Sequence, residues 1–344
     1  MRAKYFALLP VMFLIVYCGK NVFAQSVSKT GTTAASFLEI PVGADAIGMG
    51  SAYVSVADDA SSLFWNPSGI AALENYEVIL SHTDWIADTD FDYAGLVIPL
   101  GSLGNIGLSF TSLTMGDMKV RTVEKPDGTG EYFTASDISI GISYSRNLSD
   151  RFSIGFTGKF IQQKIWHMSA TAFAIDAGTK FKTDLLGGMV IGASIYNFGT
   201  AMKLEGRDTR YFISVDDSKQ GTTDQIPVNI ETDSWDLPMI FQIGVSTNAI
   251  QTTNYRVTVA ADAIHPNNNY QSMNFGFEAS YNESIFIRGG YQSAFIKESE
   301  GGLSFGVGVS SKLILSDAFI NFDYAFRDFG RLQNVNTFSL NIKF

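Results

Sequence analysis

The final residues of the chain alternate between apolar and polar positions. Phe338, Leu340, Ile342 and Phe344 occupy every second position, and the residues between them are polar. Because successive side chains of a β-strand point to opposite faces, a period of two predicts a strand with one apolar face and one wet face. We therefore expect residues 337–344 to form an amphipathic strand that ends on an aromatic residue.

The same alternation recurs along the chain from residue 76 onward. The segments that carry it are 76–83, 90–100, 104–114, 138–145, 152–157, 170–182, 188–198, 238–248, 254–264, 270–281, 284–293, 303–310, 318–327 and 337–344. Single-chain bacterial outer-membrane barrels have an even number of antiparallel strands with this pattern. The sequence therefore predicts an all-β fold, a transmembrane antiparallel β-barrel of about 14 strands over residues 74–344.

The connections between these segments alternate in length. The short links lie near 101–103, 149–150, 184–186, 249–253, 282–283 and 316–317, and the longer ones include 115–135, 199–236 and 294–302. Outer-membrane barrels have tight periplasmic turns and longer outside loops, so we expect both chain termini on the periplasmic side. The acidic loop 199–236 is either a functional, partly folded element or a solvated cover of the barrel mouth.

Composition and charge agree with a membrane protein built from strands. The chain of 344 residues is 46% hydrophobic and 17% charged. After the N-terminal region, however, it has no run of about eighteen apolar residues that could span a bilayer as a helix. Its abundant Gly (32), Phe (27) and Tyr (14) suit long strands with one face toward lipid. The net charge of −10 argues against nucleic acid as a partner, because phosphate binding requires a basic face.

The N-terminus has the features of an export signal. Arg2 and Lys4 precede an apolar run that ends at Cys18, and Ala24 supplies a small residue for a signal peptidase. We therefore assign residues 1–24 to a signal peptide that is cleaved after Ala24. Cys18 lacks the small preceding residues of a lipidation site, so we interpret it as an ordinary signal-peptide residue. The mature chain then has no cysteine, which excludes disulfides and thiolate chemistry.

Residues 36–73 do not fit the pattern of a membrane strand, and we assign residues 25–73 to an N-terminal hatch-like segment. Their glycines permit close backbone turns, and an acidic pair followed by small and apolar residues predicts a short helix over 60–64 that an Asn-Pro step ends. A compact, semi-apolar segment is therefore expected before the barrel. The residues singled out for its geometry are Gly48, Gly50, Asp58, Asp59, Trp65, Asn66 and Pro67.

Three motifs in this segment carry a family resemblance. They are Gly48-Met49-Gly50, Val56-Ala57-Asp58-Asp59-Ala60 and Trp65-Asn66-Pro67-Ser68-Gly69. With the strand count and the terminal Phe344, they make the chain resemble the PorV/PorQ family of outer-membrane proteins, which is related to the FadL-type long-chain fatty-acid transporters. The resemblance implies a hatch packed in the barrel lumen around an Asn-Pro-Ala element, for which this chain has Asn-Pro-Ser. The hatch is either a mobile gate or a fixed lock for the N-terminus.

Patterns for catalysis and metal binding are weak. His82 and Asp84 share one face of a strand, a geometry that barrel hydrolases use, and polar rim residues are the alternative. Asp88, Asp90 and Asp92 alternate in a way that suits Ca²⁺, but the central glycine and distal glutamate of an EF-hand loop are missing. No glycine-rich phosphate loop precedes a helix. We therefore predict no enzymatic activity, no metal site and no cofactor.

Charged residues of both signs fall on the wet side of the predicted strands. They are Asp92, Lys159, Asp176, Lys180, Arg256, Asp262, Glu278, Arg288, Asp323 and Arg327. Charges at membrane depth are expected to face the lumen. A mixture of both signs favours hydrogen-bonded networks that hold a plug rather than a selectivity ring of one sign, although a weak pore is an alternative. Wall side chains alone do not fill a barrel of this size, so we expect a plug or water inside it.

Two functions remain open at this point. Resemblance to PorV/PorQ implies an accessory of type IX secretion that binds or shuttles secreted proteins through its outer loops, with translocon components as further partners. The relationship to FadL implies a channel for hydrophobic small molecules. The Trp65-Asn66-Pro67 form and the long acidic loop favour the first. Either function implies the bacterial outer membrane as location, contact with outer-membrane lipid, and a barrel-assembly machinery that recognises Phe344.

Overall fold

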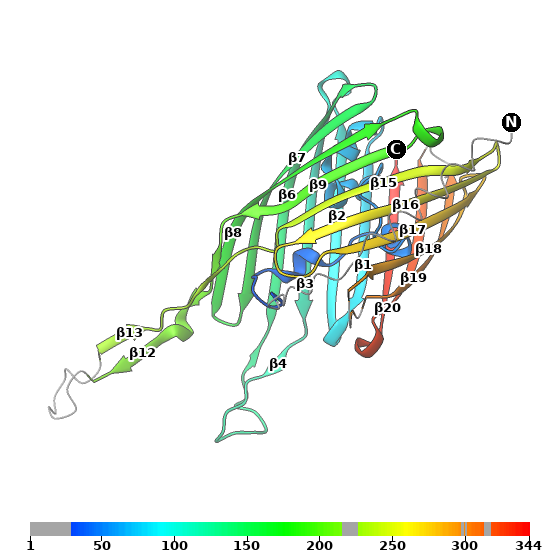
Figure 1. Cartoon of the computed structure of the whole chain (residues 1–344). Helices are drawn as coiled ribbons and strands as arrows, with labels where there is room; N and C mark the ends of the chain where they lie inside the picture. The colour runs from blue at the N-terminus through cyan, green and yellow to red at the C-terminus, as the bar shows by residue number, and fades with distance from the viewer. Residues whose placement is uncertain (1–28, 215–225, 297–298, 300, 313–317) are drawn as a thin grey trace, which may run out of the picture.

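The computed structural model describes residues 29–214, 226–296, 299, 301–312 and 318–344. The predicted signal peptide 1–24 lies outside the described residues, as does the predicted short link at 316–317. Strands dominate the described part of the chain (Figure 1). Within that part, no helix has the length and apolar character needed to cross a membrane.

Long antiparallel strands form a single closed wall. They are β1 (Glu77–Trp85), β2 (Thr89–Pro99), β3 (Asn105–Met115), β6 (Ala135–Ser149), β7 (Phe152–Ile165), β8 (Met168–Lys182), β9 (Val190–Gly199), β15 (Ile240–Gln251), β16 (Tyr255–Pro266), β17 (Ser272–Tyr281), β18 (Ile285–Ala294), β19 (Leu303–Lys312), β20 (Phe319–Asp328) and β21 (Asn334–Lys343). The wall closes because β1 pairs with β21 and β8 pairs with β9, while the short β11 (Glu205–Gly206) extends it beside β8. The predicted 14-stranded antiparallel barrel is confirmed.

The wall strands are amphipathic, as the period of two predicted. In β6, the side chains of Ile140, Ile142 and Tyr144 are exposed on the outer face, whereas those of Ser143 and Ser145 are buried on the inner face. In a bilayer, the outward side chains contact lipid and the inward ones line the lumen. The alternation in sequence therefore becomes an apolar exterior and a polar interior.

The two ends of the barrel differ in their connections. One end, which we call the short-turn end, carries η4 (Gly101–Leu103) and η5 (Leu185–Gly187). The opposite end, the long-loop end, carries η3 (Ile86–Asp88), η6 (Arg207–Thr209), η7 (Gly330–Leu332) and two-stranded ribbons. The ribbons are β4–β5 (Met118–Lys119 with Tyr132–Phe133), β10–β14 (Met202–Lys203 with Ser234–Trp235) and β12–β13 (Arg210–Ile213 with Ile226–Asn229). Two of them, β4–β5 and β12–β13, project well beyond the wall (Figure 1).

The segment before β1 lies inside the barrel (Figure 1). It contains η1 (Ser36–Glu39), α2 (Ala44–Gly48), α3 (Ser62–Trp65) and η2 (Pro67–Ala72). Its apolar side chains pack on inward-facing wall residues: Leu63 and Ile70 join a cluster with Ile79, and Ile47 packs with Ala325. The helix α3 overlaps the predicted helix at 60–64, whereas the sequence pattern did not predict the other three. We call residues 33–73 the lumenal segment.

The lumenal segment crosses the barrel from end to end. Thr33 forms a β-bridge with Asp236 at the long-loop end. At the short-turn end, the carbonyl of Leu73 accepts a hydrogen bond of 2.7 Å from Asn105. Phe344 lies at the short-turn end as well. Residues 33–73 therefore run from the long-loop end to the start of β1 at the short-turn end. The expectation that both chain termini lie on one side stays a prediction, because residues 1–28 lie outside the described residues.

Candidate functional site

Asn66 stands at the junction of α3 and η2 and ties the lumenal segment to the wall. Its side-chain nitrogen donates to the carbonyl of Val54 at 2.9 Å and to that of Thr179 on β8 at 3.0 Å. Its side-chain oxygen accepts from the backbone N–H and the hydroxyl of Ser68, at 3.2 and 2.7 Å. Gly178 makes room for this amide, since a Cβ there would meet Asn66 Oδ1 at 2.1 Å. The position requires a donor and an acceptor on one short side chain, which asparagine provides.

Trp65 and Pro67 flank this amide and are both buried. Trp65 Nε1 donates to the carbonyl of Val42 at 2.8 Å, and its indole makes an edge contact with Tyr53 at a centroid separation of 6.1 Å. Pro67 packs on Gly155 of β7, where a Cβ would meet the Pro67 carbonyl carbon at 2.3 Å. The Trp-Asn-Pro motif thus seats the lumenal segment against β7 and β8.

Gly48 and Gly50 bring the lumenal segment close to another part of the wall. A Cβ at Gly48 would meet the Cα of Gly306 on β19 at 2.9 Å. Gly50 has a φ of +65°, and a Cβ there would meet the Tyr291 backbone nitrogen at 2.6 Å and the Phe275 carbonyl oxygen at 2.7 Å. A left-handed backbone and close backbone contact both favour glycine. These residues therefore let the segment contact β17, β18 and β19.

The two neighbouring aspartates of the lumenal segment have different surroundings. Asp58 is exposed, whereas Asp59 accepts hydrogen bonds from the N–H and hydroxyl of Ser61 just before α3. Asp59 also accepts from Asn341 Nδ2 at 3.2 Å. Asp59 thus connects the start of α3 to the last strand of the barrel.

Glu77, at the start of β1, belongs to the same junction. Its Oε1 accepts from the Ala60 N–H at 3.1 Å and from Asn341 Nδ2 at 2.5 Å, and its Oε2 lies 3.5 Å from Lys343 Nζ. The side chain is 1% exposed. Sequence reasoning missed Glu77, because only the pairing of β1 with β21 brings its partners together. No local motif marks it.

A charged network on the inner wall centres on Arg288. Its Nε donates to Glu278 at 2.7 Å and its Nη1 to Asp323 at 2.5 Å. Arg256 lies 3.0 Å from the same Glu278. These four side chains belong to β16, β17, β18 and β20 and comprise two positive and two negative charges, and Glu283 in the β17–β18 turn adds a third carboxylate through Arg256. The network therefore braces the wall and gives no field of a single sign.

Other inner-wall charges hold the lumenal segment directly. Lys180 Nζ donates to the carbonyl of Ala57 at 2.6 Å. Asp262 accepts from the Val54 N–H at 3.0 Å. These two bonds use charged side chains to satisfy backbone groups that the segment buries in the lumen, which would otherwise be costly.

The remaining predicted lumen charges, Lys159, Asp176 and Arg327, also face the lumen. Lys159 Nζ lies 2.6 Å from Asp176 Oδ2, and the Asp176 side chain is fully buried. Arg327 donates through Nη1 to Gln292 at 3.0 Å and is 2% exposed. The structure thus brings most of the predicted charges into pairs or contacts with the segment.

A cavity of about 1280 Å³ lies between the lumenal segment and the short-turn end. It is lined by Asp58 and Asp59 of the segment, by Lys180 and Arg256 of the wall, and by turn residues that include Asn282. The lining is polar and carries both signs of charge. This space is the part of the lumen that the segment leaves open, and it faces the end where the turns are short.

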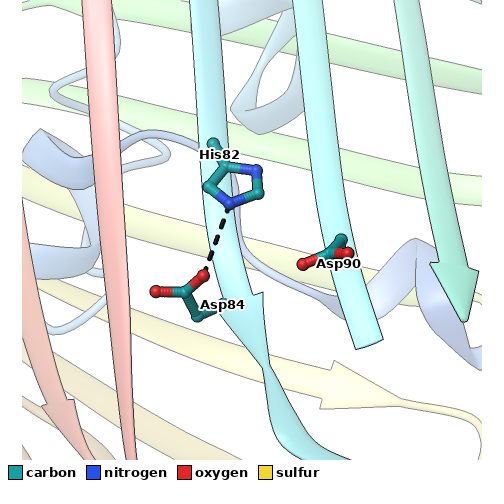
Figure 2. A group of neighbouring side chains, drawn as sticks. All are labelled: His82, Asp84 and Asp90. Carbon is teal, nitrogen blue, oxygen red and sulfur yellow. Dashed lines mark ion pairs between the residues drawn. The ribbon is translucent and has the colours of Figure 1, made fainter. Parts of the chain in front are cut away.

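His82, Asp84 and Asp90 lie together on the outer wall, near the long-loop end of β1 and β2 (Figure 2). His82 Nε2 is 3.4 Å from Asp84 Oδ1, and a possible ligand atom of Asp90 lies within 4.8 Å of both residues. His82 Nδ1 lies 2.7 Å from Asp92 Oδ1, so Asp92 faces outward and the prediction that it lines the lumen is wrong. Asp88 lies apart from this group in η3. All of these side chains are separate from the lumenal segment.

The arrangement of wall and lumenal segment is the fold of FadL-type outer-membrane channels. The Pseudomonas putida toluene transporter TodX has a TM-score of 0.53 to this structure at 11% identity, with 88% of this chain and 97% of that chain covered. A Pseudomonas aeruginosa FadL homologue gives 0.51 at 12%, covering 88% and 98%. The Ralstonia pickettii toluene transporter TbuX gives 0.51 at 11%, covering 88% and 97%. At such identities the likeness is one of fold.

A family model defines the protein more closely. Residues 23–224, more than half of the chain, match the type IX secretion system protein PorV. The chain therefore belongs to the PorV family and is a β-barrel protein of the bacterial outer membrane. The resemblances to PorV and to FadL-type barrels that the motifs indicated are both confirmed. Among curated proteins, no sequence matches this chain.

Proposed function

We propose that this barrel serves type IX secretion by binding secreted proteins or translocon components at its long-loop end. Besides the family match, the ribbon β12–β13 carries the proposal. Tyr211, Phe212 and Ile213 on β12 are 54%, 60% and 46% exposed. Within the described residues, the two strands pair only with each other. An isolated ribbon that exposes large apolar side chains is typical of a surface that contacts another protein.

In this proposal, residues 25–73 are a fixed plug and residues 74–344 are the barrel that presents the loops. The Ala44 N–H donates to Ser339 at 2.8 Å, Asn66 to Thr179, and Asp262 accepts from the segment on a third side. Movement of the segment would break bonds to several strands at once. These contacts support a fixed plug in the lumen rather than a gate that opens during function.

The orientation of the barrel can be tested first. An epitope inserted at Gly128 on the β4–β5 ribbon should be reached by antibody on intact cells, while one inserted between Ser149 and Asp150 should be reached only after permeabilisation. Detection of the second epitope alone on intact cells would place the long-loop end in the periplasm and overturn the proposal.

The binding role is tested by changing the ribbon and keeping the fourteen long wall strands, while the short β11 is shortened together with the loop. Shortening residues 205–230 should abolish co-purification of secreted partners while the barrel keeps its heat-modifiable mobility, because outer loops contribute little to barrel stability. Phe212→Ser should weaken capture, and Tyr132→Ser on the other ribbon is the matched control. Undiminished capture by the shortened protein would refute this role for the ribbon.

Uptake of hydrophobic small molecules is the second candidate, and the FadL-type fold favours it. It requires the plug to yield, so Trp65→Ala or Asn66→Ala should change the uptake of a labelled fatty acid while partner capture is unaffected. Under the secretion role, by contrast, the shortened ribbon should leave uptake unchanged. A ribbon variant that loses uptake but keeps partner capture would favour the channel over the secretion role.

A further inference from the structure

Arg327 on β20 is a buried cation without an acidic partner among the residues that the structure describes. It is 2% exposed, and its Nη1 donates to Gln292 Oε1 at 3.0 Å. Its Nε and Nη2 have no hydrogen-bond partner in the described part of the chain. A guanidinium remains charged in proteins, so burying one with two unpartnered nitrogens and no counter-charge is costly.

The other two arginines of the inner wall show what the free groups of Arg327 lack. Arg288 meets two carboxylates, Glu278 and Asp323. Arg256 binds Glu283 through Nε at 2.9 Å and Nη2 at 2.8 Å, so one edge of its guanidinium holds both oxygens of a carboxylate. The unoccupied atoms of Arg327 are the same pair, Nε and Nη2. This edge is the one that binds carboxylate or phosphate with two parallel hydrogen bonds.

Two aromatic rings hold the Arg327 guanidinium at the long-loop end of the lumen. Its Cζ lies 4.2 Å from the ring centroid of Phe329 and 5.3 Å from that of Trp85. The two rings are themselves in edge contact, with centroids 5.4 Å apart. Phe329 directly follows β20 and Trp85 ends β1, so both stand where the wall meets the long loops. Stacking of this kind stabilises the cation and fixes its plane, while the Nε–Nη2 edge is left without a hydrogen-bond partner in the described residues.

From this geometry we propose that Arg327 is the centre of an oxyanion-binding site inside the long-loop end of the barrel. The site takes one carboxylate or phosphate group on the Nε–Nη2 edge, with Gln292 holding the opposite side of the guanidinium and Trp85 and Phe329 beside it. The family match assigns no such site, and the proposal is independent of the secretion role. Two charge-assisted hydrogen bonds to one anion would supply the missing counter-charge.

The test uses the full chain, purified in an uncharged detergent, with hexanoate and inorganic phosphate as separate probes. Thermal unfolding should shift upward with the concentration of at least one probe, because a ligand that binds only the folded state stabilises it. Hexanamide, which has the same chain without the charge, should give no shift. Arg327→Gln should weaken probe binding at least about tenfold, and Arg327→Lys should also weaken it, because a lysine cannot form the bidentate edge. Arg151→Gln, at an exposed turn, is the matched control and should behave as wild type.

Several results would overturn the proposal. The first two are no shift of the unfolding temperature with either probe and equal shifts with hexanoate and hexanamide. The third is equal probe binding by wild type and Arg327→Lys. Because Arg327→Lys retains the positive charge, it keeps the test decisive even where Arg327→Gln does not fold. The link 295–302 also contains two glutamates, at 298 and 300. If a variant with glutamine at both positions binds a probe that wild type does not, a carboxylate of the chain itself occupies the edge, and no external anion is needed. Binding by wild type that Arg327→Lys weakens supports the site.

Discussion

Asn341 donates a hydrogen bond of 3.2 Å to Asp59, so the strand that closes the barrel is bonded to the segment that fills it. The same nitrogen also donates to Glu77 on the first strand, at 2.5 Å. The first strand, the last strand and the lumenal segment therefore meet at a single side-chain amide. Because Asn341 is 4% exposed, water does not readily replace these bonds.

Asn341→Ala should lower the free energy of unfolding by about 1–3 kcal/mol, since it leaves the buried carboxylate of Glu77 and the partly buried one of Asp59 without their shared donor. The measurement is the urea midpoint of the loss of heat-modifiable mobility in lipid vesicles. Asn334→Ala, at the exposed opposite end of the same strand, is the control. Equal midpoints for the two variants would show that the junction does not stabilise the barrel.

Gly178→Ala should displace the Asn66 amide, because the added Cβ would lie 2.1 Å from Asn66 Oδ1. We expect a loss of about 1–3 kcal/mol of stability and faster proteolysis of the lumenal segment. Gly158→Ala on the neighbouring strand is the matched control, since a Cβ there meets nothing within 4 Å. In an Asn66→Ala background, the change at 178 should cost much less, because the two residues interact. Additive effects would contradict the contact.

Deletion of Phe344 or Phe344→Asp should reduce the amount of assembled barrel in the outer membrane. The Phe344 ring stacks on Tyr76 at a centroid distance of 5.8 Å, and the two residues exchange backbone hydrogen bonds of 3.0 and 3.1 Å just beyond the seam. Phe295→Asp, at a side chain that is 82% exposed, is the control. If heat-modifiable Phe344→Asp protein reaches wild-type levels in the outer membrane, the prediction is wrong.

Glu283, in the turn between β17 and β18, should make stability depend on acid pH. Its hydrogen bonds with Arg256 lower the pKa of the carboxyl below its ordinary value of 4.5. A lowered pKa in the folded state stabilises the protein above the ordinary pKa, and the stabilisation disappears as the pH falls through the folded pKa. Wild type should therefore unfold at higher temperature than Glu283→Gln at pH 7, with the difference shrinking toward pH 3. The side chain is 59% exposed, so the effect is small, and a difference that grows in acid would contradict it.

The period of two was sufficient to predict the wall because one physical constraint acts on almost every strand. Ile140 and Ile142 must face lipid, and Ser139 and Ser143 must face the lumen, so the pattern survives in the sequence. The close pairing of Gly178 with Asn66 has no such signature. The two residues are far apart in the chain, and only barrel closure brings them together.

The error at Asp92 has a physical cause in the same strand. Phe91 and Tyr93 face inward, where they pack with the apolar cluster that includes Leu63 of the lumenal segment. The inner face of β2 is therefore apolar. Its outer face becomes polar near the long-loop end, where outward side chains are leaving the lipid core. In this part of β2 the inward side chains are apolar and the outward ones are polar, which is the opposite of the arrangement in β6. The alternation of polar and apolar residues alone therefore assigns Asp92 to the wrong face.

The end-to-end course of the lumenal segment also constrains the order of assembly. Residues 33–73 precede β1 in the chain, yet they occupy the space that the pairing of β1 with β21 encloses. Threading them through a finished ring would require every bond to the wall to form inside a closed space. The simplest sequence of events is that the segment collects the strands around itself and the first and last strands join afterward. In that order, the lumenal segment would be in place before the cylinder closes.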